Sequence, residues 1–227
     1  MKRKRMAKLI AVLCLAALFA FESESASAQV FGMKGGVTIG SVTTREVDSI
    51  NPMLNYYFEA YYACRFQRYK YWTVGIGYFG TGATLFGLDE GNQIKYEATV
   101  RFNNFVVPVK IKLSAEGKRK PRPYAFLGAM PAVMYNEDKS VKLSMKDPEK
   151  HVPSGLNTDY IFKWTPNRLN LYALCGGGCY YRHFTLDFMF TVNALRDYKE
   201  IEAPISYNKS FIVTLGYQVS ADRSKIW

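Results

Sequence analysis

Residues 184–192 read Phe184-Thr185-Leu186-Asp187-Phe188-Met189-Phe190-Thr191-Val192. Aromatic or aliphatic residues occupy every second position, and the intervening positions hold mostly polar residues. Successive side chains of a β-strand point to opposite faces, so this period of two predicts a strand with one apolar face. The same alternation runs through Phe31, Met33, Gly35, Val37 and Ile39, and again through Phe211, Val213, Leu215, Tyr217 and Val219.

The alternation recurs in eight segments, at residues 30–40, 54–66, 71–84, 94–113, 123–135, 168–182, 184–193 and 209–219. Each is near or above the roughly 9–11 residues that a tilted membrane-spanning strand needs. Short connections near 67–69, 114–122 and 182–183 alternate with long ones at 41–53, 85–93, 136–167 and 194–208. Short turns at one end and long loops at the other are typical of an outer-membrane β-barrel. We predict an all-β fold, an eight-stranded antiparallel up-and-down transmembrane β-barrel with both termini on the periplasmic, short-turn side.

A soluble lipocalin-like barrel is the alternative, since it also has eight alternating strands. The two differ in which face is apolar, because a membrane barrel turns its apolar residues outward. Here the non-apolar faces carry isolated charges, at Lys34, Glu59, Lys110, Lys112 and Asp187. Charges tolerate a polar lumen far better than an apolar cavity. Aromatic residues near the strand ends form the expected interfacial girdle, namely Tyr56, Tyr62, Phe66, Trp72, Tyr78 and Phe184.

The first 28 residues have the features of a secretory signal peptide. A basic start is followed by an apolar run from Leu9 to Ala20 and by Ala26-Ser27-Ala28. We predict cleavage after Ala28, which leaves residues 29–227 as the barrel domain. Residues 1–28 hold five basic and two acidic residues, so the formal net charge falls from +11 to +8. Export to the bacterial outer membrane argues against a nucleic-acid partner, which the charge alone would suggest.

Several segments resemble the PorT-like outer-membrane β-barrel family of Gram-negative bacteria. The first strand, residues 31–37, resembles that family's opening strand. Residues 104–110 resemble its strand with the pattern hydrophobic–Pro–hydrophobic–Lys. Residues 120–129 and the glycine-rich hairpin at 177–187 are also similar. The resemblance implies a barrel in the outer membrane. It also implies, as an alternative function, an accessory role in a protein-secretion system of the envelope.

Two sets of charged residues stand out as candidate sites. Lys34, Glu59, Lys110 and Asp187 are predicted to form a charge network that closes the lumen, because unpaired charges there would be costly. A basic rim at the periplasmic end is predicted from Arg65, Arg68, Lys70, Lys118, Arg119, Lys120, Arg122 and Arg182. Its expected partners are outer-membrane lipids, with envelope or secretion-system proteins as the alternative. The expected function is structural or interaction-based and depends on the surface loops, chiefly residues 136–167.

Other motifs give weaker signals. Gly75, Gly77 and Gly80 match the G-x-G-x-x-G pattern, but no helix start follows, so we expect a crowded lumen rather than a nucleotide site. Cys175 and Cys179 are too far apart on one strand to form a disulfide, and with Cys64 they are expected to face lipid. Asp147, Glu149 and His151 could bind a cation, but a hydrophilic loop is the favoured interpretation. We therefore expect no catalytic, cofactor or metal site and no enzyme activity.

Overall fold

The computed structural model describes residues 29–44, 49–88, 94–115, 121–145, 167–195 and 205–220. They form nine β-strands. These are β1 (Gln29–Thr44), β2 (Ser49–Gln67), β3 (Lys70–Leu88), β4 (Ile94–Val106), β5 (Val109–Ser114), β6 (Arg122–Met145), β7 (Leu169–Tyr181), β8 (Phe184–Asn193) and β9 (Ile205–Ser220). The predicted signal peptide lies outside the described residues.

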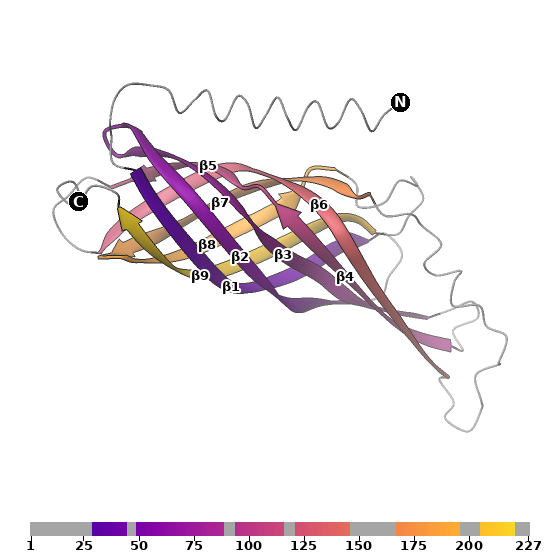
Figure 1. The fold of residues 1–227 in the computed structure, drawn as a ribbon. Helices are drawn as coiled ribbons and strands as arrows, with labels where there is room; N and C mark the ends of the chain where they lie inside the picture. Colours follow the sequence, from indigo (N-terminus) through magenta and orange to yellow (C-terminus); the bar gives the residue numbers. More distant parts are fainter. Residues whose placement is uncertain are drawn as a thin grey trace, which may run out of the picture.

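The strands form one closed antiparallel ring (Figure 1). Apart from β4 and β5, which both pair with β3 and β6, each strand pairs with its neighbour in sequence. β1 also pairs with β9 from Val30↔Ser220 to Thr44↔Ile205. This last pairing closes the sheet and removes both edges, which is how a barrel satisfies every backbone hydrogen bond. The predicted eight-stranded up-and-down barrel is therefore confirmed, with β4 and β5 together acting as one strand.

The break between β4 and β5 corrects the prediction of one strand over residues 94–113. Val107 and Pro108 lie between the two segments, and proline has no N–H to donate to a neighbouring strand. The ladder still continues across the break, because the Pro108 carbonyl accepts from Gly75 N at 2.9 Å and Val107 N donates to the Pro131 carbonyl at 2.9 Å. Both segments pair with β3 and β6, so the break interrupts the strand without opening the ring.

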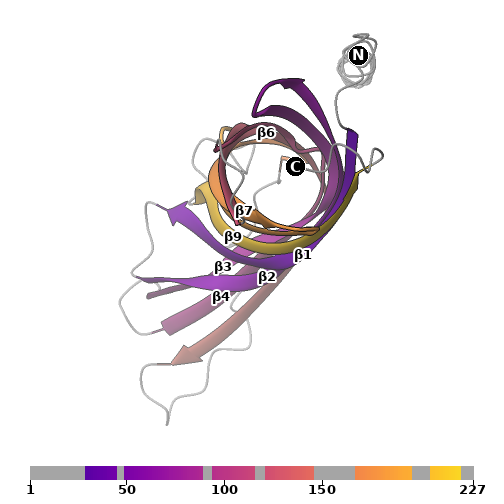
Figure 2. The ribbon, with the colours of Figure 1, turned by 90° about the vertical axis from the view of Figure 1, so that its left-hand side faces the viewer.

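Several strands extend much further than predicted at one end, which we name the long-connection end. Residues 136–145, predicted as loop, belong to β6 and pair with β4 as far as Met145↔Ile94. β6 pairs with β7 only as far as Val133↔Leu169, so it continues beyond the ring with β4 alone. Figure 2 shows the ends of β2, β3, β4 and β6 spreading away from the ring. Parts of the predicted loops 41–53, 85–93 and 194–208 are likewise strand.

The opposite end, which we name the short-turn end, has the tight turns that the sequence predicts. Arg68-Tyr69 joins β2 to β3, and Arg182-His183 joins β7 to β8. One residue in each turn has a positive φ angle, Tyr69 (φ 65°) and Arg182 (φ 54°), which reverses the chain direction within two residues. β1 begins and β9 finishes at this same short-turn end.

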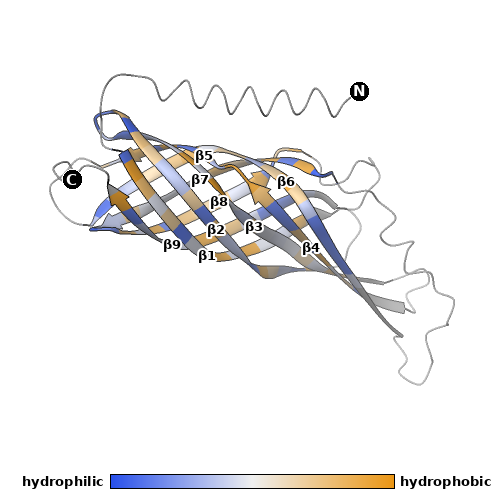
Figure 3. Ribbon diagram, viewed as in Figure 1, coloured by the Kyte–Doolittle hydropathy of each residue, from blue (hydrophilic) through white to orange (hydrophobic). Residues whose placement is uncertain are grey.

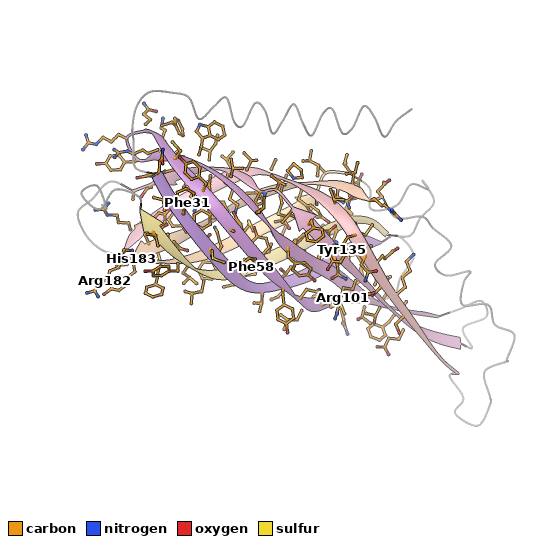
Figure 4. All side chains as sticks on the ribbon, viewed as in Figure 1. Phe31, Phe58, Arg101, Tyr135, Arg182 and His183 are labelled. Carbon is orange, nitrogen blue, oxygen red and sulfur yellow. The ribbon has the colours of Figure 1, made fainter. Side chains whose placement is uncertain are left out.

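The outer wall of the barrel is apolar. Large hydrophobic side chains point outward from every strand of the ring, among them Phe31, Phe58, Leu127, Leu171, Phe188 and Leu215. Figure 3 shows hydrophobic and hydrophilic residues mixed along the strands, and Figure 4 shows the Phe31 and Phe58 side chains. A soluble barrel would bury these groups in its interior, so the lipocalin-like alternative is wrong.

No helix among the described residues is long and apolar enough to cross a membrane.

Candidate functional site: a buried charge cluster in the lumen

The structure brings together the four charged residues predicted to face the lumen. Lys34 Nζ donates to Asp187 Oδ2 at 2.6 Å and lies 3.7 Å from Glu59 Oε2. Lys110 Nζ donates to the same Glu59 oxygen at 2.6 Å. The four residues are only 0–3% exposed. They come from β1, β2, β5 and β8, so the cluster links strands around the ring.

Tyrosines donate to one oxygen of each carboxylate, while Glu59 Oε1 is buried without a hydrogen-bond partner among the described residues. Tyr57 Oη donates to Glu59 Oε2 at 2.6 Å, and Tyr124 Oη donates to Asp187 Oδ1. A buried carboxylate is tolerable only when charges and donors surround it, and each of these has both. The sequence analysis did not assign these tyrosines to the lumen. Tyr57 is separated from Glu59 by two positions, so strand parity alone would have placed it there.

Lys112 is a third buried cation in this cluster, which we name the lumen charge cluster together with Lys34, Glu59, Lys110 and Asp187. No ion pair to Lys112 occurs among the described residues. Its ammonium instead lies 4.8, 5.2 and 5.6 Å from the ring centres of Tyr124, Tyr61 and Tyr180. The electron-rich faces of aromatic rings attract a cation, more strongly where water is excluded. Three lysines and two carboxylates leave the cluster with one positive charge in excess.

The glycine motif of β3 makes room for this cluster. Gly75 is buried, and a Cβ there would lie 2.8 Å from Glu59 Oε1 and 2.9 Å from Glu59 Cγ. A side chain at this position would displace the carboxylate. Gly77 and Gly80 continue the same strand, and β3 leads on as strand to Leu88 rather than into a helix. The G-x-G-x-x-G pattern therefore serves close packing, as expected.

The interior is less polar than the sequence analysis predicted. An apolar layer fills the ring next to the lumen charge cluster, and it contains Tyr57, Phe79, Val106, Phe126, Met130, Tyr172, Leu174, Met189 and Ile212. A second apolar layer includes Val42, Leu85, Val100, Phe102 and Met134. An eight-stranded barrel has an interior just wide enough for side chains, and here the buried side chains include aromatic rings as well as charges.

The described part of the predicted basic rim lies at the short-turn end. Arg68 and Arg182 are in the two hairpin turns, and their guanidinium groups lie 5.0 and 5.6 Å from the ring centres of Tyr69 and Tyr181. Figure 4 shows Arg182 beside His183 at this end. The remaining described members are Arg65, Lys70 and Arg122. Lys118, Arg119 and Lys120 lie outside the described residues.

The structure also places the cysteines and His183. Cys64, Cys175 and Cys179 are free thiols, and none of them is fully buried. His183 Nδ1 lies 3.2 Å from the Gln218 carbonyl, and its ring lies 5.7 Å from that of Tyr217. Among the described residues, no three His, Cys, Asp or Glu side chains gather as a metal site. Asp147, Glu149 and His151 lie outside the described residues.

A closed antiparallel ring with an apolar exterior and charged side chains in its interior defines the class of transmembrane β-barrels. The chain belongs to the family described as "Outer membrane protein beta-barrel domain", which it matches over residues 23–200. This membership supports location in the outer membrane. The PorT-like subgroup inferred from the sequence is not distinguished by this match.

Solved structures with a similar fold are outer-membrane proteins. The attachment invasion locus protein Ail of Yersinia pestis is 11% identical, with 85% of this chain and 99% of that chain covered and a TM-score of 0.36. OprG of Pseudomonas aeruginosa is 12% identical, with 85% and 97% covered and a TM-score of 0.44. Neisserial surface protein A is 11% identical, with 83% and 96% covered and a TM-score of 0.41. No curated protein matches the chain.

Proposed function

We propose that the protein is a non-enzymatic outer-membrane barrel with a closed lumen, which acts through contacts at its long-connection end. The observation that carries this proposal is the burial of the lumen charge cluster. Its five charged side chains are 0–3% exposed although they lie inside the ring. A pore lined by charges would leave those charges in contact with water. If side chains fill the lumen, other molecules can contact the barrel only at its two rims and at the strands that extend beyond them.

Two features favour the long-connection end as the contact surface. The strands β2, β3, β4 and β6 extend beyond the ring there, which gives a rigid platform for the connections between them. An up-and-down barrel with an even strand number places its short turns and termini on the periplasmic side. The long-connection end then faces the exterior, and the basic rim faces the periplasm and the inner-leaflet headgroups.

Site-specific photo-crosslinking in intact cells tests where contacts form. A photoreactive amino acid is placed at Ser140 or Leu195, both exposed at the long-connection end, and at Arg68 or Arg182 as matched positions at the short-turn end. We expect covalent adducts from the first two positions. Adducts at no position contradict an interaction role. Adducts only at Arg68 and Arg182 replace it with the secretion-system role that the PorT-like resemblance implies.

A further inference from the structure

An aromatic platform lies on the outer wall at the long-connection edge of the apolar surface. Tyr78 of β3, Phe105 of β4 and Tyr135 of β6 come from adjacent strands of the ring. The Tyr135 ring centre lies 4.7 Å from that of Phe105 and 6.5 Å from that of Tyr78. Phe105 and Tyr135 are 60% and 54% exposed, so their rings face the membrane rather than the interior. Aromatic residues take this position at the boundary between hydrocarbon and headgroups.

A β-bulge sits at this boundary. In the β4–β6 register Asn104 pairs with Met134 and Asn103 pairs with Asn136, so Tyr135 is an extra residue of β6. Tyr135 and Asn136 are consequently both exposed. Beyond the bulge the alternation of β6 is reversed, which turns Asp138 outward. Bulges commonly redirect side chains at sites of function.

Polar side chains cover the outer wall next to the aromatic platform, on the side of the long-connection end. Asp138 accepts from Asn136 Nδ2 at 2.8 Å and from Asn103 Nδ2 at 3.2 Å. Asn103 in turn accepts from Tyr78 Oη at 2.8 Å, which ties the polar group to the platform. The carboxylate is thus held by two amides from two strands. This arrangement orders a polar surface at the depth where lipid headgroups begin.

Arg101 supplies an exposed cation beside this ordered surface. It lies opposite Asp138 in the β4–β6 register, yet within the described strands no ion pair joins the two side chains. Asp138 accepts from the amides of Asn103 and Asn136, and the described residues show no hydrogen bond from Arg101 to it. The guanidinium therefore has donors to offer to an external anion, and its planar fork suits a phosphate. Figure 4 shows Arg101 and Tyr135 at the opposite end of the barrel from Arg182.

We infer that Tyr78, Phe105, Tyr135, Asn136, Asp138 and Arg101 bind the phosphorylated saccharide headgroup of a membrane glycolipid. Acyl chains would lie along the apolar wall. The sugar would contact the aromatic platform and the Asp138 carboxylate with its two asparagine amides, and the phosphate would meet Arg101. The occupant follows from continuity with the lipid-facing wall and from the charge of Arg101. The inference rests on the proposed orientation, with this edge in the outer leaflet. It does not require a closed lumen.

Native mass spectrometry of the purified barrel in detergent tests this site with diphosphoryl lipid A as the probe. Arg101→Gln should weaken binding about tenfold, the effect of one lost charge-assisted hydrogen bond. Arg101→Lys should give an intermediate affinity, because it keeps the charge and loses the fork. Tyr135→Leu should also weaken binding. Lys209→Gln, at an exposed position of β9, and Phe190→Leu are matched controls away from the site, and they should stay within about twofold of wild type.

Three results would overturn the inference. Equal binding by Arg101→Gln and Lys209→Gln excludes the arginine contact. Equal binding of phosphatidylglycerol at the same concentration excludes recognition of the sugar. Full competition by water-soluble glucose 6-phosphate excludes the lipid and leaves a simple anion site. Heat-modifiable gel mobility of each variant establishes that the barrel is folded, so failure of this site stays distinct from failure of the proposed closed lumen.

Discussion

Replacement of Glu59 by glutamine should lower the free energy of unfolding by about 3–5 kcal/mol. The glutamine keeps the shape and the hydrogen-bond acceptor but removes the charge. Lys110 at 2.6 Å and Lys34 at 3.7 Å then lose their shared counter-ion, and the excess positive charge of the lumen charge cluster rises. A buried cation left without its partner is far more costly than the intact pair. Urea unfolding of the barrel in lipid vesicles measures the change.

The control for this prediction is an ion pair at the periphery. Glu137 lies 3.1 Å from Lys139, and their side chains keep 12% and 22% exposure. Glu137→Gln should cost about 1 kcal/mol or less, because water screens such pairs. The double variant Glu59→Gln/Lys110→Met should lose less stability than the two single variants summed, since removing both members spares the orphaned charge. Additive losses, or a Glu59→Gln cost equal to that of Glu137→Gln, would show that the cluster is not electrostatically coupled.

Replacement of Gly178 by valine should prevent the barrel from reaching its folded form. A Cβ at this position would lie 2.2 Å from the Leu186 carbonyl oxygen, 2.7 Å from Asp187 Oδ1 and 2.9 Å from Tyr124 Cζ. The first contact is with the backbone of β8, so the clash cannot be relieved by a side-chain rotation alone. It also displaces the Tyr124–Asp187 pair from the lumen charge cluster. We expect no heat-modifiable folded band after refolding into detergent or vesicles.

Gly177 provides a matched control for Gly178. It is adjacent in sequence but faces the opposite side of β7, and a Cβ there would meet only the Tyr124 carbonyl oxygen, at 3.1 Å. Valine favours strands, so Gly177→Val should fold with a stability within about 1 kcal/mol of wild type. A folded Gly178→Val barrel, or equal damage from both substitutions, would contradict close packing around Asp187.

Most of the correct predictions from the sequence rest on the alternation of side chains between the two faces of each strand. Alternation with a period of two separates Lys34, Glu59, Lys110 and Asp187 from their outward-facing neighbours, and a one-residue error would reverse every assignment. The fold and the grouping of these charges follow from that period together with the lengths of the connections. Sequence alone does not show that Glu59 contacts two lysines at once. This depends on the tilt of the strands and on the register between strands that are far apart in the ring.

Other features escaped prediction for identifiable reasons. Residues 136–140 are polar at every position, so this part of β6 lacks the apolar–polar alternation that marks a strand, although backbone pairing with β4 continues. The bulge at Tyr135 reverses the phase of β6, and no residue type marks it. Tyr61, Tyr124 and Tyr180 were not recognised as lumen residues because aromatic rings suit the membrane interface equally well.

Single-channel recording of the wild-type protein in a planar lipid bilayer is the most direct test of the closed lumen. The filled ring and the buried lumen charge cluster predict no steady conductance above the bare-membrane level after insertion of folded barrels. Insertion is verified independently by heat-modifiable mobility of the protein recovered from the same vesicle stock. A steady, large conductance that scales with the number of inserted barrels would contradict the closed lumen and identify the protein as an open pore.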